Sequence, residues 1–191
     1  MGNGKDKETS GHGTKEGRPR RYPTEPLGGF AVADIGFHAA EIEELHERAY
    51  DLIDDLPVSA INFVPQGANL SIGWLAVHMI VAETTLVHRL TAQEIPSVIE
   101  SEPNYADFTP YGTPLKPFGS GASIVALGKT VFGEYTIPSL RAIDSLEIPG
   151  PIPPLPTARE VLRHLSWHWI YHSGQIGLIR LQWGSDYEWR F

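Results

Sequence analysis

The stretch that decides the fold is "EVLRHLSWHWIYHSGQIGLIRLQWG", residues 160–184, because it places three histidines in one apolar segment. His164, His168 and His172 follow one another at intervals of four residues. On an α-helix four residues turn the chain by about 400°, so each histidine lies only ~40° from the preceding one. The three side chains therefore form one shallow stripe. That stripe is either a polar helix face or a surface against which a metal ion binds.

Both ends of this segment carry helix-terminating signals. Thr157 is followed three residues later by Glu160, which is the spacing of a capping box at a helix N-terminus. Gly184 stands where a glycine commonly ends a helix, because it adopts the left-handed backbone conformation without a steric penalty. The sequence therefore predicts one long helix between residues 157 and 184.

Three further segments show helical spacing of apolar residues, near residues 35–56, 70–92 and 121–145. The second is the most apolar, as a more buried helix would be. Gly133 and Pro138 interrupt the third segment and predict a kink or break there. No strand pattern and no repeat is apparent. These segments predict an all-α domain, most simply a four-helix bundle.

Two segments lie outside the predicted helices. Residues 1–28 are rich in Gly, Lys, Glu and Pro and lack apolar periodicity, which predicts a disordered tail before a domain at 29–191. The connection at residues 95–119 is rich in Pro and Gly and carries aromatic side chains between its prolines. A connection of this length is usually functional or disordered. Its aromatic side chains suggest that it packs against the domain, and a functional site is one candidate for the surface that it covers.

Composition excludes several kinds of site. The chain of 191 residues contains no cysteine, so any metal site must be built from His, Asp and Glu. The formal charge is −8, and six of the 15 Lys and Arg residues lie within residues 1–22, so the remainder is strongly acidic. An acidic body argues against a nucleic-acid surface. No apolar run approaches the ~20 residues needed to cross a bilayer, and no signal peptide is apparent. We therefore expect neither a membrane nor a nucleic-acid partner, and a cytoplasmic location.

A fourth histidine, His78, lies in the apolar second segment. Taken singly, a histidine in such a helix is more often a core side chain than a ligand. Metal sites in helical bundles, however, are assembled from inward-facing residues on different helices, often with an i, i+4 pair on one of them. His168 and His172 can supply the pair and His78 the third ligand. Three neutral imidazoles leave a position open for water or substrate, as in catalytic sites.

Two motifs around these histidines resemble the DinB-like superfamily, and within it the YfiT-type metalloenzymes. "NLSIGWLAVHMIVAE" at 69–83 matches the form S-I-x-W-x-x-x-H, and "HWIYHSGQIGLIR" at 168–180 matches H-x-x-x-H-x-G-Q-I. The resemblance implies a four-helix bundle over roughly residues 35–185. It also implies that the superfamily's metal triad maps onto His78, His168 and His172, and that the metal is a divalent ion, typically nickel or zinc.

The residues beside the motif histidines have their own interpretations. Gln175 can hydrogen-bond a ligand histidine or cap a buried carbonyl, and Ser71 can support the site from one helical face. Trp74 is either a wall of the metal pocket or an ordinary core side chain. His164 falls outside the motif, so we assign it to the helix surface or to a hydrogen bond beside the metal. Gly174 is interpreted as a place where this helix packs closely on a neighbour.

The remaining histidines are expected to lie outside the site. His46 and His88 have charged or polar neighbours in the sequence and are predicted to face solvent, and His12 belongs to the tail.

An open tris-histidine site supports two kinds of chemistry. A bound metal can lower the pKa of water, or it can favour the thiolate form of an incoming thiol, which this cysteine-free chain cannot supply itself. Characterised members of the resembling superfamily include transferases of low-molecular-weight thiols. The resemblance therefore favours a metal-dependent transferase that joins such a thiol cosubstrate to a small electrophilic substrate. No residue is assigned as general base or other catalytic group.

Two alternatives remain open from the sequence. One is a bundle without catalysis, which keeps its metal as a structural or sensory element or acts as a stress-associated binding module. The other is a metal-dependent hydrolase, which needs a base within reach of the attacking water. Bundles of the superfamily often pair through helix faces, so the resemblance also implies a possible homodimer without indicating the face.

Overall fold

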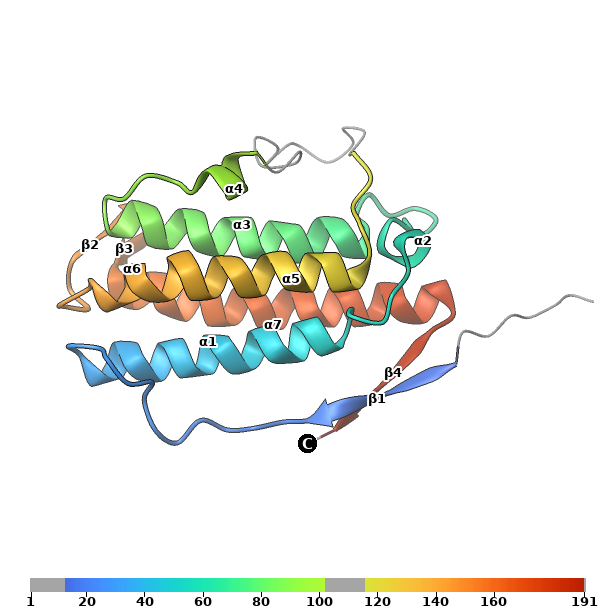
Figure 1. Ribbon diagram of the computed structural model, residues 1–191, viewed down its shortest axis with the longest axis horizontal. Helices are drawn as coiled ribbons and strands as arrows, with labels where there is room; N and C mark the ends of the chain where they lie inside the picture. Colours follow the sequence, from blue (N-terminus) through green and yellow to red (C-terminus); the bar gives the residue numbers. More distant parts are fainter. Residues whose placement is uncertain (1–12, 102–115, 191) are drawn as a thin grey trace, which may run out of the picture.

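The computed structural model describes residues 13–101 and 116–190, and these residues are mostly helical (Figure 1). Within them lie seven α-helices and one π-helical segment. The helical elements are α1 (Ala33–Asp51), α2 (Val58–Ile61), α3 (Ile72–Leu90), α4 (Ser97–Glu100), α5 (Gly121–Val131), η1 (Phe132–Thr136), α6 (Ile137–Arg141) and α7 (Ala158–Trp183).

The four predicted helical segments correspond to α1, to α3, to the run from α5 to α6, and to α7, which lie side by side in Figure 1. In the third segment the α-helix is interrupted where a break or kink was expected, and the chain stays helical through the interruption. Gly133 lies in the π-helical η1, and Pro138 lies in the first turn of α6, where a missing N–H costs little. A change of hydrogen-bonding pattern thus accommodates both residues.

Two small sheets were not predicted. β1 (Thr14–Pro19) pairs in parallel with β4 (Asp186–Arg190), and β2 (Pro149–Ile152) pairs in antiparallel fashion with β3 (Leu155–Thr157). The strands are short and rich in Pro and charged residues, so their sequences carry no alternating apolar pattern. The disordered tail expected at residues 1–28 therefore differs from the structure at 14–19, while residues 1–12 lie outside the described ranges.

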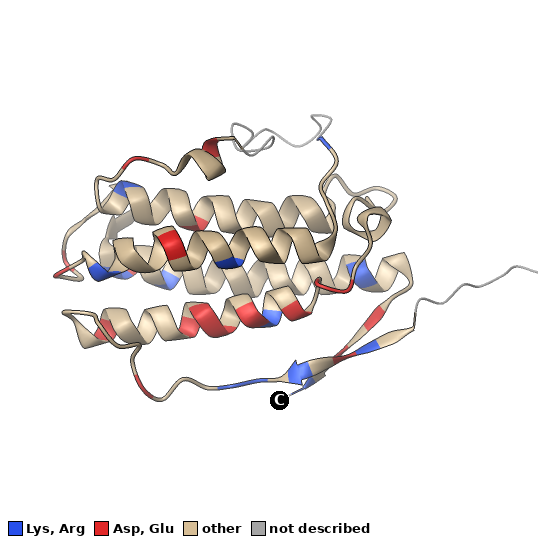
Figure 2. Ribbon diagram, viewed as in Figure 1, with Lys and Arg blue, Asp and Glu red and all other residues tan. Residues whose placement is uncertain are grey.

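Acidic residues of α1 hold the N-terminal segment in place. Figure 2 shows acidic residues gathered along α1 and basic residues on the segment that contains β1. Glu44 accepts hydrogen bonds from the Arg21 backbone N–H at 2.9 Å and from Arg18 Nη2 at 3.0 Å. Asp51 accepts from the Arg18 backbone N–H at 2.8 Å and from Tyr187 Oη, on β4, at 2.6 Å. Both ends of the described chain are therefore tied to α1.

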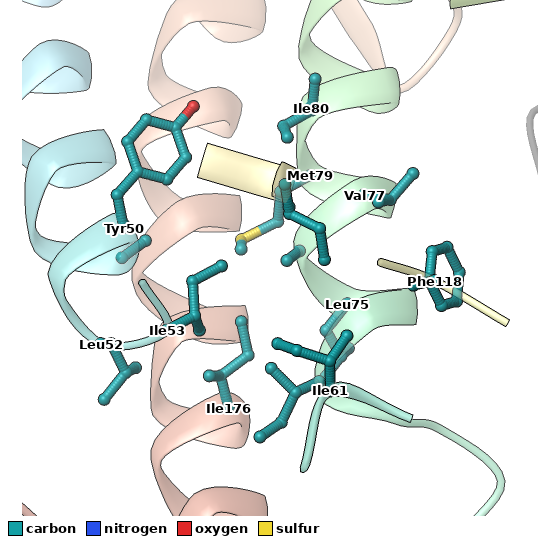
Figure 3. Close-up of a cluster of buried hydrophobic side chains, with 14 of the residues drawn as sticks. Tyr50, Leu52, Ile53, Ile61, Leu75, Val77, Met79, Ile80, Phe118 and Ile176 are labelled. Carbon is teal, nitrogen blue, oxygen red and sulfur yellow. The ribbon is translucent and has the colours of Figure 1, made fainter. Parts of the chain in front are cut away.

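The core lies between α1, α3, the α5–α6 run and α7. One of its clusters is drawn in Figure 3, where Ile53 from the turn after α1, Met79 of α3 and Ile176 of α7 point toward one another. Burial of such side chains stabilises the fold by roughly 1.5–3 kcal/mol each. Because α3 and α7 both contribute to this cluster, the packing of the core fixes how the two histidine-bearing helices face each other.

No helix in the described ranges is long and apolar enough to cross a membrane.

Candidate metal centre

Three histidines from two helices meet at one place in the structure. His78 lies on α3, and His168 and His172 lie one turn apart on α7. The Nε2 atoms of His78 and His168 are 3.0 Å apart, and one ligand nitrogen from each of the three residues lies within 4.8 Å of the others. His168 is buried, whereas His78 and His172 are half-buried. The cluster is therefore compact and reachable from one side.

Burial keeps these imidazoles uncharged at neutral pH. It lowers the pKa of His78 to about 4, with a further contribution from His172, and the pKa of His168 to about 3, with contributions from its histidine neighbours. Burial also lowers the pKa of His172, against the opposing effect of a hydrogen bond to Gln175. Neutral imidazoles carry the lone pairs that a metal ion needs.

Gln175 and Trp74 orient two of the three rings. His172 donates from Nδ1 to Gln175 Oε1 at 2.6 Å, which leaves the Nε2 lone pair of His172 available. This is the kind of outer contact that fixes the tautomer of a metal-binding histidine. The Trp74 indole stacks on the His78 ring, with centroids 4.7 Å apart and planes 15° apart. Trp74 thus forms one wall of the cluster.

Ser71 and His164 lie near the cluster in different ways. Ser71 Oγ accepts a hydrogen bond from the Trp74 backbone N–H at 3.1 Å, so it caps the N-terminus of α3, the helix that carries His78. The His164 ring stacks on His168, with centroids 5.5 Å apart, but His164 is not part of the three-residue ligand group. Burial lowers the pKa of His164 as well.

The cluster fits a divalent cation. His168 Nδ1 is buried and has no hydrogen-bond partner among the described residues, and its Nε2 faces another imidazole. Buried polar atoms normally have partners, and a cation would engage lone pairs that protein atoms leave unused. In the described part of the chain the group consists of histidines alone, with no carboxylate. Imidazole nitrogens suit zinc, nickel, copper and iron.

The predictions that His46 and His88 face solvent are wrong. Both side chains are buried, with exposed fractions of 3% and 4%. His46 Nε2 lies 2.7 Å from Glu83 Oε2, which also accepts a hydrogen bond from Trp169 Nε1 at 2.7 Å. His88 Nδ1 lies 2.7 Å from the Glu94 carbonyl oxygen. The sequence analysis missed these buried histidines because it considered only the residues adjacent to each histidine in the sequence.

Helical spacing would have found His46. It lies four residues after Ile42 and three before Ala49, and both are buried on the core side of α1. Glu83 gives a comparable signal, because it is a lone carboxylate in the apolar sequence of α3. A charged group at such a position requires buried partners.

A groove of about 570 Å³ lies on the other side of α7. Ile170, Ser173 and Gly174 line it from α7, together with residues of α1, the segment that follows β1, and Trp189. On a helix with about 100° per residue, Gly174 lies some 200° around α7 from His172, so the groove is separate from the histidine cluster.

Most of the connection predicted to pack over a site, residues 102–115 of the range 95–119, lies outside the described residues. At its ends, residues 97–100 form α4 and Phe118 packs into the core.

Comparison with models of known protein families gives a match. The family model described as the DinB superfamily matches residues 41–176, which is most of the chain and includes all three clustered histidines. No curated protein matches the chain.

Proposed function

The chain belongs to the DinB superfamily, and we propose that it is a metal-dependent transferase which activates a low-molecular-weight thiol for attack on a small electrophile. In this proposal the chain is a DinB-type four-helix bundle, with the α5–α6 run counted as one helix. His78, His168 and His172 hold a divalent ion, nickel or zinc. The observation that carries the proposal is that the three ligand nitrogens lie within 4.8 Å of one another.

The composition of the cluster favours a catalytic site over a structural one. Three protein ligands leave at least one coordination position for a small molecule, whereas structural sites are usually closed by four. A bound divalent cation supplies positive charge that lowers the pKa of a thiol. The protein contains no cysteine, so the sulfur must come from a cosubstrate.

The protein residues around the cluster have supporting roles in this proposal. Gln175 holds His172 in the tautomer that presents Nε2. Trp74, stacked on His78, excludes water from one side and offers an apolar surface to the substrate. The half-buried faces of His78 and His172 mark the side from which a thiol approaches. We place this activity in the cytoplasm, where small thiols are abundant and reduced.

The first experiment measures metal content in untagged protein purified without chelator. We expect near-stoichiometric nickel or zinc in the wild type and its loss in His78→Ala and in His168→Ala. His164→Ala is the matched control, because His164 stacks on His168 without joining the ligand group, and it should retain the metal. Wild-type protein that folds yet takes up neither ion would contradict the proposal.

The second experiment tests the reaction on metal-loaded protein. Low-molecular-weight thiols are incubated with an aryl halide, and thioether formation is followed by mass spectrometry. We expect product with the wild type and none with His168→Ala. Full metal occupancy without thioether formation would favour a non-catalytic metal site. Hydrolysis of the electrophile in the absence of thiol would favour the hydrolase alternative.

A further inference from the structure

The groove between α1 and α7 has the size and lining of a small-molecule site. Its volume is about 570 Å³, within the range of roughly 300–1,000 Å³ that ligand pockets occupy. Much of its wall is apolar or aromatic: Phe37 and Leu45 come from α1, Ile170 from α7 and Trp189 from β4. Phe37, Ile170 and Trp189 are large, yet between 39% and 53% exposed. The groove therefore presents apolar surface that no described residue covers.

Gly174 keeps the groove open on the α7 side. A Cβ atom added there would meet nothing within 4 Å, so the expectation that Gly174 packs closely on a neighbouring helix is wrong. Because Gly174 lines the groove, a side chain at this position would occupy part of it. Glycine destabilises the inside of a helix relative to alanine, but it lets a ligand approach the backbone closely. A molecule lying against the α7 backbone would account for this glycine.

Arg48 brings a positive charge to one end of the groove. Its guanidinium lies 5.4 Å from the centroid of the Trp189 ring, and its Nη1 donates to the Arg190 carbonyl oxygen at 3.3 Å. Arg20, which also lines the groove, lies 4.6 Å from the centroid of the Tyr22 ring. Within the described ranges neither Arg48 nor Arg20 has a carboxylate as an ion-pair partner. Since a guanidinium carries five N–H donors, Arg48 has donors left for an anion in the groove.

The acids that line the groove leave this charge in place. Glu44 is engaged by Arg18 and Arg21, at 3.0 Å and 3.1 Å. Glu41 lies seven residues before Arg48, which is about 10 Å away along the axis of α1. The groove is therefore positive at the Arg48 end and apolar along its length.

We propose that this groove binds a small aromatic carboxylate. The rings lie on the apolar side chains and against the backbone at Gly174, and the carboxylate pairs with Arg48. Arginine suits this role because its planar fork matches both carboxylate oxygens while its face rests on an aromatic ring, here Trp189. From Phe37 to Arg48 the groove follows α1 for about 16 Å, which accommodates two fused rings and a carboxylate.

This site is independent of the proposed function. The groove lies on the side of α7 away from the histidine cluster, and none of the three clustered histidines lines it. Binding in the groove requires no metal ion. The carboxylate site and the metal centre can therefore be tested, and can fail, separately.

Binding of 2-naphthoate to the full chain tests the site. The chain contains five tryptophans, so five indole N–H signals report on different places in the NMR spectrum, and Trp189→Phe and Trp74→Phe identify two of them. Titration should shift the signal of Trp189. The signal of Trp74, which stacks on His78, should stay in place. A dissociation constant of about 1 mM or below is expected for a ligand of this size.

Two variants separate the contribution of charge from that of space. Arg48→Gln removes the cation, and Gly174→Leu fills the groove, and each should weaken binding by about tenfold or more. Arg89→Gln is the control for charge, at an exposed position in the last turn of α3. Gly133→Leu is the control for space, because Gly133 is also helical and exposed and has no atom within 4 Å of an added Cβ. Both controls should bind as the wild type does, and circular dichroism verifies that all four variants fold.

A neutral analogue tests whether the carboxylate meets Arg48. 2-Naphthamide has the same rings without the charge, and it should bind the wild type about tenfold more weakly than 2-naphthoate. In Arg48→Gln the two compounds should bind with similar affinity, because the group that distinguishes them is gone. An equal preference for 2-naphthoate in both proteins would place the carboxylate elsewhere.

Several other results would overturn the inference. No indole shift up to the solubility limit of 2-naphthoate would mean that the groove does not take this class of ligand. A shift of Trp74 without one of Trp189, or loss of binding in His168→Ala, would assign the carboxylate to the histidine cluster. Unchanged affinity in Gly174→Leu would show that the ligand does not lie against α7.

Discussion

At the scale of single residues, a hydrogen bond selects the tautomer of one histidine of the cluster. A histidine binds a metal through one nitrogen, and the group that engages the other nitrogen decides which one is free. His172 has such a partner in Gln175, at 2.6 Å. The neutral amide three residues along the same helix is therefore part of the candidate metal centre, although it belongs to no group of candidate ligands.

Replacing Gln175 should weaken metal binding without removing it. We expect Gln175→Ala to lower the affinity for zinc or nickel by about 10–100-fold, the usual effect of losing an outer partner of a ligand histidine. The measurement is competition with a chromophoric chelator. Gln182→Ala, at an exposed position on the same helix, is the control and should leave the affinity unchanged. Equal affinities for all three proteins would contradict this role.

Two helices end in the same hydrogen-bonded motif with different residues. At the end of α7, Gly184 has a φ of 99°, and its N–H and that of Ser185 bond back to Leu181 and Arg180. At the end of α3, Ala92 has a φ of 52°, with equivalent bonds from Ala92 and Gln93 to Arg89 and His88. A left-handed conformation is unfavourable for alanine and free for glycine.

Ala92→Gly should therefore stabilise the protein. We expect a gain of about 1 kcal/mol in the free energy of unfolding, from relief of the left-handed strain. Gly184→Ala should lose a similar amount for the same reason. The control is Ala126→Gly, at an exposed position inside α5, where the identical substitution should destabilise by roughly 0.5–1 kcal/mol. Urea unfolding measures all three, and the same sign for Ala92→Gly and Ala126→Gly would refute the argument.

At the scale of elements, a buried polar group joins three helices. His46 of α1, Glu83 of α3 and Trp169 of α7 meet at the Glu83 carboxylate, which is 2% exposed. The energy of a buried hydrogen bond depends more strongly on distance and direction than the energy of an apolar contact does. This group therefore restrains the relative register of α3 and α7. That register places His78, five residues before Glu83, opposite His168, which directly precedes Trp169.

Removing the carboxylate should destabilise the fold substantially. Glu83→Met leaves the donors of His46 and Trp169 buried without an acceptor, so we expect a loss of about 3 kcal/mol. Glu83→Gln keeps one acceptor oxygen and should lose less. Glu43→Met, at an exposed carboxylate of α1, is the control and should change the free energy of unfolding little. A loss from Glu83→Met no larger than that of the control would argue against the group.

At the scale of the whole molecule, the two ends of the described chain close over one face of α1. β1 and β4 pair with each other, and the acids of α1 bind both. Arg180 adds a link from α7: it is 1% exposed and donates from both terminal nitrogens to Asp55 at 2.8 Å. The contact joins the last turn of α7 to the turn that follows α1. Charge pairing attaches this layer to the helices, together with the packing of Tyr187 into the core.

The attachment should weaken in acid. Burial alone would raise the pKa of Glu44, but hydrogen bonds from Arg21 and Arg18 outweigh it and hold the pKa below its usual 4.5. The pKa of Asp51 is likewise lowered against its burial, by Tyr187, Arg18 and Lys15. A carboxyl with a lowered folded-state pKa contributes stability above its unfolded value and loses it as the pH falls through the folded value. We expect near-constant stability down to about pH 4.5 and a decline below it.

Glu44→Gln checks the origin of that decline. The variant should be less stable than the wild type at neutral pH. The difference should shrink as the pH falls below 4.5, because the carboxyl of the unfolded wild type is protonated before that of the folded protein. Urea unfolding at a series of pH values gives the curve. A difference that stays constant across the series would mean that Glu44 does not titrate in this way.

By itself the sequence determined the elements whose signals are local. Thr157, Glu160 and Gly184 lie within or beside one helix, and their capping and terminating roles predicted α7 correctly. The histidine motifs are local too, because each occupies a few turns of one helix. Their meeting in space followed from the resemblance and from the rule that bundle sites face inward, and the structure brings the three side chains together.

Only the tertiary structure decided what depends on partners distant in the chain. β1 and β4 are far apart in sequence, and neither has a pattern of its own, so their pairing arises when α1 and α7 bring the two ends together. The burial of His46 and Glu83 depends in the same way on three helices meeting. Gly174 shows the opposite case: its helix was predictable, but its outward direction was not. Helix formation is governed by neighbouring residues, whereas the environment of each face is set by whatever packs against it.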